Sequence, residues 1–157
     1  MNGVKALDKA LEPIKSEYSY IVIDNQPLVG TMQMLQAANC ADDMIITLHP
    51  DSANVQGCVN LIEGLPEIRQ LNPKLRIDGI LLGRNRATNN ERLYISLMMA
   101  WAAKLETRVY RTIVREGVCV QEAQGNAVWL WDDYADEGAA RDFSDFVDKY
   151  LRKDQHD

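Results

Sequence analysis

The sequence predicts an α/β domain of three layers, in which helices cover both faces of a mainly parallel sheet of about 4–5 strands. Short apolar runs rich in β-branched residues, the first at residues 20–24, are typical of strands buried on both faces. These runs alternate with segments of helical periodicity, which indicates parallel strands joined by right-handed crossovers. We therefore expect residues 1–157 to form a single domain with a frayed, charged tail at residues 152–157.

The strands are expected where apolar runs end in polar or turn residues. Strands are predicted over residues 20–24, 44–48, 77–82, 108–114 and 128–131. The last of these is short and is expected at the edge of the sheet. Between the last two, Glu116 and Gly117 open what we expect to be a loop that includes Glu122.

Helices are predicted where apolar residues recur every three to four positions. This spacing occurs over residues 4–14, 34–38, 52–68, 88–105 and 139–151. Pro66 lies inside the third segment, so we expect either a kink or two helices that meet there. Thr88 and Glu91 have the spacing of a capping box at the start of the fourth.

Composition excludes several classes of protein. The net charge of −6 argues against a broad basic face for DNA. No apolar run approaches the roughly 20 residues of a membrane helix, and charges interrupt the apolar pattern of the first residues, unlike a secretory signal. Three widely spaced cysteines fit neither a disulfide framework nor a zinc site, which indicates free thiols and a cytoplasmic protein.

The segment around the first strand carries a recognisable pattern. Three hydrophobic residues precede Asp24, and Pro27 and Gly30 follow it at fixed spacing. This pattern resembles the Asp-bearing strand and following loop of ParA/MinD-type (Soj-like) partitioning ATPases. The likeness extends over residues 4–151 and is strongest in IRQLNPKLRIDGILL, residues 68–82; further matching positions are Pro50, Gly57, Glu122, Ala123, Gly125, Asp132, Gly138 and Ala139.

The family's phosphate-binding loop has no counterpart in this sequence. The motif G-x-x-x-x-G-K-[ST] does not occur, and no Gly-Lys pair exists. The chain therefore resembles the C-terminal portion of a ParA-like protein, a truncated P-loop NTPase-like fold. The family uses ATP and Mg²⁺, whereas no cofactor is expected for this chain alone.

The resemblance also implies roles for individual residues. In the family, the residue at Asp24 helps to hold Mg²⁺, usually through water; the competing interpretation is a carboxylate that caps the following turn. Loops on the nucleotide side would include Pro27, Gly30, Asn85, Arg115 and Glu122. Arg115 stands where the family usually has Pro, and Cys119 where relatives often carry Arg.

The loop after the third predicted strand is rich in arginine. Arg84, Arg86 and Arg92 surround three asparagines at the same sheet edge as Asp24. They are candidates for contacts with phosphate or an acidic partner. The competing interpretation is a solvated loop with surface ion pairs. His49, without a nucleophile or a second histidine nearby, is expected to be a hydrogen-bonded loop residue.

Two functions follow from these observations. The first is a ParA-like chromosome or plasmid partitioning ATPase, or a fragment of one, that cannot hydrolyse ATP alone because it lacks the phosphate loop. The second is a non-enzymatic interaction module that forms a homodimer or docks onto a complete ParA-like ATPase. Self-association would cover the sheet edge left open by the missing strand; the alternative is that the predicted strands 20–24 and 44–48 pair directly and close the sheet. Trp129 or Trp131 could lie in an interface, and neither DNA nor membrane is an expected partner.

Overall fold

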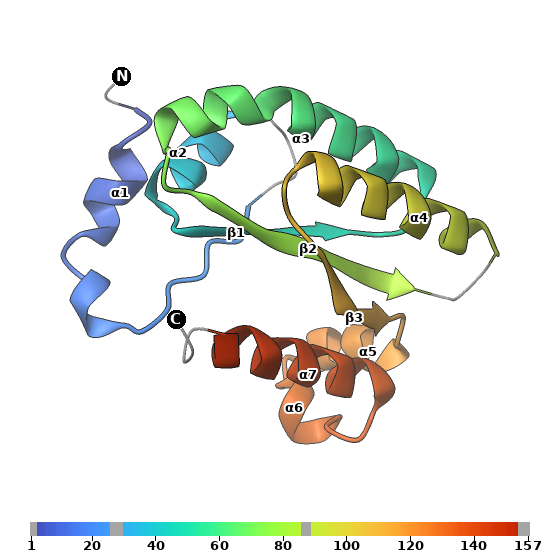
Figure 1. Cartoon of the computed structure of the whole chain (residues 1–157). Helices are drawn as coiled ribbons and strands as arrows, with labels where there is room; N and C mark the ends of the chain where they lie inside the picture. The colour runs from blue at the N-terminus through green and yellow to red at the C-terminus, as the bar shows by residue number, and fades with distance from the viewer. Residues whose placement is uncertain (1–2, 26–29, 86–88, 154–157) are drawn as a thin grey trace. The chain divides into compact units, whose positions relative to one another are not determined.

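The computed structural model describes residues 3–25, 30–85 and 89–153. Among these residues, three strands form one sheet in the order β1 (Asp43–Leu48), β2 (Arg76–Asn85) and β3 (Val109–Arg115), as Figure 1 shows. β2 and β3 are parallel, with Ile80 opposite Val109 and Leu82 opposite Ile113. The predicted α/β class is confirmed, but the described residues contain fewer strands than the expected four or five.

Two of the predicted strands are wrong. Residues 20–24 have no regular secondary structure and are not part of the sheet, because a segment becomes a strand only where a neighbouring strand pairs with it. Residues 128–131 instead enter the one-turn helix α6 (Leu130–Asp133). There the left-handed Ala127 reverses the chain after the preceding helix.

The chain divides into two compact units, Met1–Ile45 with Ala53–Asp78, and Ile46–Ser52 with Gly79–Asp157. The first unit contains α1 (Ala6–Leu11), the 3₁₀ turn η1 (Lys15–Glu17), α2 (Met32–Cys40) and nearly all of α3 (Ser52–Leu71). Thr31 caps α2 by accepting the Met34 N–H at 3.3 Å. The predicted helices at 4–14 and 34–38 are present, the first one shortened at both ends.

Polar side chains join the elements of the first unit. The Asn72 side-chain amide donates to the carbonyl oxygens of Ala38 and Ala41 at 3.0 and 2.9 Å, which fixes the end of α3 to the end of α2. Arg76 at the start of β2 forms a bidentate pair with Asp43 at the start of β1, at 2.7 and 2.8 Å.

α3 is one helix that continues through Pro66. The expectation of two helices meeting there is wrong. Proline lacks the N–H that would bond one turn back, but Leu65 and Ile68 on either side are buried. Burial of apolar residues on both sides offsets the lost hydrogen bond.

The second unit contains α4 (Asn89–Lys104), α5 (Val118–Asn126), α6 and α7 (Gly138–Lys153). In Figure 1, α4 and α7 lie on opposite sides of β3, which gives this unit its three layers. The largest fully buried side chains here are Ile80, Leu82, Met98 and Leu105. The predicted loop that includes Glu122 is wrong, because α5 occupies those residues.

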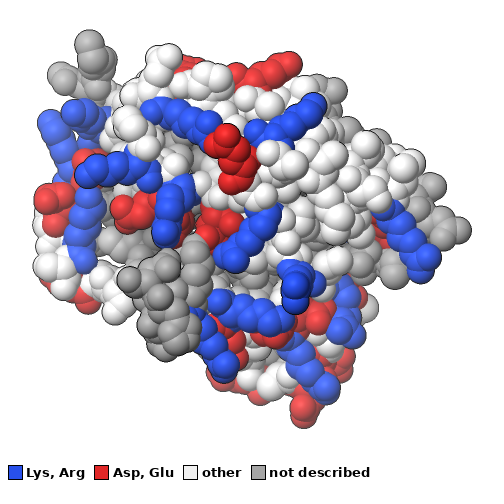
Figure 2. Space-filling view, viewed as in Figure 1, with Lys and Arg blue, Asp and Glu red and all other residues white. Residues whose placement is uncertain are grey.

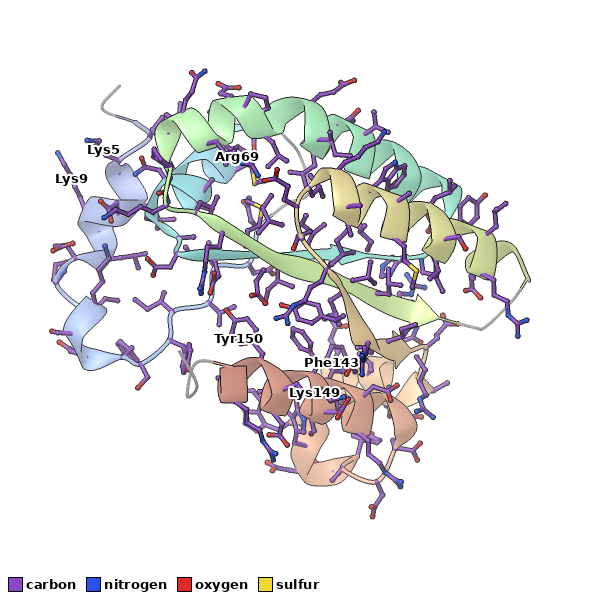
Figure 3. The ribbon with its side chains drawn as sticks, viewed as in Figure 1. Lys5, Lys9, Arg69, Phe143, Lys149 and Tyr150 are labelled. Carbon is purple, nitrogen blue, oxygen red and sulfur yellow. The ribbon has the colours of Figure 1, made fainter. Side chains whose placement is uncertain are left out.

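α7 is attached to β3 by polar and aromatic contacts. The Thr112 hydroxyl donates to Asp145 Oδ2 at 2.6 Å and accepts from Lys149 Nζ at 3.1 Å. Lys149 is labelled on α7 in Figure 3. The Tyr110 and Phe146 rings meet edge to face with centroids 4.9 Å apart. Figure 2 shows basic and acidic side chains interspersed over α7, whose predicted amphipathic character is confirmed.

Two of the three cysteines, Cys40 and Cys119, are free thiols in the structure, and the side chain of Cys58 lies outside the described residues. Within the described parts of the chain, no helix has both the length and the apolar character needed to cross a membrane.

Candidate functional site

A solvent-open cavity of about 230 Å³ lies at the carboxyl ends of the strands, within the second unit. Segments that follow β1, end β2 and follow β3 each contribute to it, together with the first turn of α4. Ligands of open α/β sheets collect at this edge, because the loops there converge on one crevice. The cavity is lined by His49, Pro50, Asp51, Arg84, Glu91 and Glu116.

His49 is fixed by the neighbouring strand. Its Nδ1 lies 3.2 Å from the carbonyl oxygen of Gly83. Because that oxygen can only accept, Nδ1 must carry the proton, and Nε2 of the neutral ring is then an acceptor. The expected role of His49 as a hydrogen-bonded loop residue is confirmed. Pro50 beside it is buried and stiffens the turn that leaves β1.

Arg84 lines the cavity with a strained backbone. Its φ of 52° lies in the left-handed region, which is uncommon for residues other than glycine. Such conformations cost about 1–3 kcal/mol and cluster at functional sites. The guanidinium NH2 is 3.5 Å from Glu116 Oε1. This exposed pair contributes little stability, but it orients both side chains at the cavity wall.

The charges of the lining decide which chemistry fits. Asp51, Glu91 and Glu116 supply three carboxylates, against the single guanidinium of Arg84. An acidic lining repels an uncompensated triphosphate and favours groups that donate hydrogen bonds, such as amines and hydroxyls. No group of three or more metal-binding side chains occurs among the described residues.

The predicted residues of the first unit lie outside this cavity. Asp24 is exposed, in a part of the chain that has no regular secondary structure. Gly30 has a φ of 83°, a conformation that favours glycine over residues with a side chain. Pro27 lies outside the described residues. The predicted metal role of Asp24 stays a prediction.

Arg115 and Glu122, predicted for the nucleotide side, do not line the cavity either. Arg115 instead forms a bidentate pair with Asp142 of α7, through Nε at 2.7 Å and NH2 at 2.8 Å. These hydrogen bonds lower the pKa of Asp142 below its ordinary value and raise that of Arg115. Glu122 is exposed on α5.

Of the arginines predicted to contact phosphate or a partner, Arg84 lines the cavity. Arg92 is exposed in the first turns of α4 and is not a lining residue. Arg86 lies outside the described residues. The backbone of Asn85 pairs with Arg115 in the sheet register, while the side chain of Asn85 is not described.

Sequence reasoning did not single out Pro50, Asp51, Glu91 and Glu116 as members of one site. Each of these residues follows the carboxyl end of a strand or lies at the start of the helix after it. Because ligands bind at this edge of an α/β sheet, that position in the sequence could have identified them as members of a site. Glu91 also fits a capping box, and the local pattern cannot distinguish a capping residue from one that lines a cavity.

Solved structures with the same arrangement define the class of fold. Cobyrinic acid a,c-diamide synthase from Mycobacterium smegmatis, solved with an ATP analogue and magnesium, superposes with a TM-score of 0.75 at 20% identity; the match covers 96% of this chain and 54% of that one. The ATP complex of Cyanothece McdA(D38A) gives a TM-score of 0.73 at 19% identity, covering 90% and 55%. The chain thus has the α/β fold of ParA-like P-loop NTPases.

Sequence comparison identifies relatives of the chain. Residues 1–77 match a family model described as an AAA domain. The sporulation initiation inhibitor protein Soj of Bacillus subtilis is 29% identical over 129 residues, which is 80% of this chain and 50% of Soj. The chromosome partitioning protein ParA of Myxococcus xanthus is 38% identical over 77 residues, covering 48% and 27%. The chain is thus a relative of ParA/MinD-type proteins, and it spans half or less of the length of these relatives.

Proposed function

We propose that this chain is the part of a ParA-like partitioning ATPase that binds the base and ribose end of ATP, and that it does not hydrolyse ATP by itself. The observation that carries the proposal is the cavity at the carboxyl ends of the strands. Its three carboxylates suit the amine of a nucleobase and the hydroxyls of a ribose, whereas they repel phosphates.

The catalytic part of the proposal rests on how phosphoryl transfer works. Positioning and electrostatic stabilisation of the phosphates account for nearly all of the catalysis. This sequence has no G-x-x-x-x-G-K-[ST] motif to supply them. Asp24 is the carboxylate that would reach Mg²⁺. Because Mg²⁺ is held by one or two carboxylates together with substrate phosphates, Asp24 would do so only where those phosphates are bound.

The test is phosphate release from Mg-ATP by the purified chain, with Bacillus subtilis Soj assayed in parallel. We expect no release above a protein-free blank. Release that rises in proportion to the chain and is lost in the variant Asp24→Ala would overturn the claim of inactivity. The base-binding claim is tested separately by calorimetry with adenosine. Weak binding that is lost in Glu116→Lys is expected, and equal binding by that variant would contradict it.

A second candidate function, an interaction module, is favoured by residues 18–25 of the first unit, which have no regular secondary structure. Tyr18 and Val22 expose 60% and 90% of their surface there. A segment with exposed apolar side chains and a strand-like sequence could form a strand with another chain when that chain binds. The partner would be a second copy of the chain or a complete ParA-like ATPase, and the solution mass with and without added Soj distinguishes the two.

A further inference from the structure

The surface formed by Val128, Trp129 and Trp131 is unusually apolar. Trp129 exposes 73% of its surface, Trp131 45% and Val128 39%. These residues lie at the start of α6 and directly before it, in the second unit. Tryptophan is highly buried on average and is enriched at interfaces between proteins. An exposed apolar patch with two tryptophans therefore indicates a docking surface. We call these three residues the tryptophan patch.

The tryptophan patch has an ordered backbone. The Val128 N–H donates to the Ala123 carbonyl at 3.0 Å, and the Asp132 N–H to the Trp129 carbonyl at 3.1 Å. Leu130, between the two tryptophans, is only half-buried. The Asn126 amide donates to the Tyr134 hydroxyl at 3.4 Å across the turn. A patch on a preformed turn loses little conformational entropy when a partner binds.

The charge around the patch has a single sign. The segment from Glu116 to Glu137 contains no Lys, Arg or His, and its six carboxylates equal the net charge of the whole chain. Asp132, Asp133 and Glu137 are exposed, and within the described part of the chain they take part in no salt bridge. Asp136 has Arg141 NH2 3.8 Å away. These acids are Glu116, Glu122, Asp132, Asp133, Asp136 and Glu137.

We propose that the tryptophan patch and the acids Asp132, Asp133 and Glu137 form a docking surface for a basic amphipathic segment of a partner protein. Apolar side chains of that segment would pack on the tryptophans. Its Lys or Arg side chains would lie over the indole faces and opposite the carboxylates. This inference is independent of nucleotide binding and of the function proposed above.

The negative charge around the tryptophan patch also disfavours other classes of binding partner. A nucleic acid or an anionic membrane surface would bring phosphates against carboxylates. A second copy docked through the same face would bring like charges together, because the segment contains no cation of its own. A basic polypeptide is the class of partner that both the aromatic and the acidic side chains fit.

The experiment uses a synthetic amphipathic helical peptide of leucine and lysine as the probe. A matched peptide with glutamate in place of lysine is the control. Binding is followed by tryptophan fluorescence in the background Trp101→Phe, so that the signal comes from Trp129 and Trp131. We expect saturable binding of the lysine peptide, a blue shift of the emission, and weakening as salt is added. The glutamate peptide should not bind.

Two sets of variants separate this surface from general attraction to an acidic protein. Asp132→Asn with Asp133→Asn should raise the Kd at least tenfold and reduce its dependence on salt. Glu63→Gln with Glu67→Gln, which removes two exposed acids of α3, should leave the Kd unchanged. Trp129→Ala should raise the Kd at least tenfold by calorimetry, with circular dichroism as the check of folding.

Three outcomes would overturn the proposal. The first is equal binding of both peptides, and the second is equal weakening by the two pairs of charge variants. The third is a shift of the tryptophan emission that appears without peptide as the protein concentration rises, together with a doubling of the mass. That result would show that the patch binds a second copy of this chain.

Discussion

Asp142 connects α7 to the end of β3 through one arginine. Its carboxylate accepts from Arg115 Nε and NH2, and also from the Arg115 backbone N–H at 3.0 Å. Three hydrogen bonds from one residue position both the side chain and the backbone at the strand end. Arg115 is thus held by a helix of its own unit, and its predicted place on the nucleotide side stays a prediction.

The variant Asp142→Asn should lower the free energy of unfolding at neutral pH by about 1–3 kcal/mol, because it replaces hydrogen bonds to a charged group. The pKa of Asp142 is depressed in the folded state, chiefly by the Arg115 hydrogen bonds. Its contribution is therefore fully present above the ordinary carboxyl pKa of 3.8 and is lost as the pH falls through the lower, folded value.

Urea unfolding at pH 7 and pH 3 measures this effect. The difference in stability between wild type and Asp142→Asn should shrink at the lower pH. Asp148→Asn, which changes an exposed carboxylate on the same helix, is the control and should change little at either pH. A difference that is the same at both pH values would contradict the role assigned to the ion pair.

The packing of α5 against α7 depends on a small residue at the start of α5. Gly117 caps α5, and a Cβ built there would lie 2.8 Å from the Cβ of Ala139 and 3.1 Å from the Cys119 sulfur. Ala139 is buried and has no flexible side chain that could move aside. Contact between the two elements therefore requires glycine for space and not for its backbone freedom.

The variant Gly117→Ala should destabilise the protein by about 1–3 kcal/mol, as overpacking of a filled core does. Gly125→Ala is the matched control, because it lies in the same helix with nothing within 4 Å of the added carbon. Since alanine is the better helix former, the control should be neutral or stabilising by up to about 1 kcal/mol. Thermal unfolding followed by circular dichroism compares them. Equal effects of the two would show that the predicted clash is absent.

At the scale of the whole molecule, the exposed apolar residues of segment 18–25 in the first unit lead to a prediction about association. Val22→Lys places a charge on the most exposed apolar side chain there. If this segment pairs with a second copy, the charge should block the association, as it does at natural sheet edges. Light scattering over a range of protein concentrations is the measurement. We expect the wild type to gain mass and Val22→Lys to remain a monomer.

Val147→Lys, on α7 in the second unit, is the control for that experiment because it also charges an exposed valine. It should associate as the wild type does. If wild type and both variants remain monomers at every concentration, self-association through this segment is excluded, and docking onto a complete ATPase becomes the surviving form of the interaction-module function.

Periodicity and turn chemistry were sufficient to predict β1, β2, β3 and α7, as well as the α/β class. Each of these elements has its own hydrophobic pattern. The apolar residues of that pattern form the face of the element that is buried when the chain folds. The order of short motifs also identified the ParA/MinD-type family, which the relatives confirm. These properties are local, so the sequence by itself determined them.

The tertiary structure decided what depends on partners distant in the chain. Residues 20–24 have the pattern of a strand, but the sheet of the described residues consists of β1, β2 and β3 and does not include them. Arg84 and Arg115 both lie at the carboxyl end of a strand, yet Arg115 is bound by Asp142 of α7 and Arg84 lines the cavity. Local sequence cannot distinguish these cases, because the energy that separates them comes from contacts made only after the chain has folded.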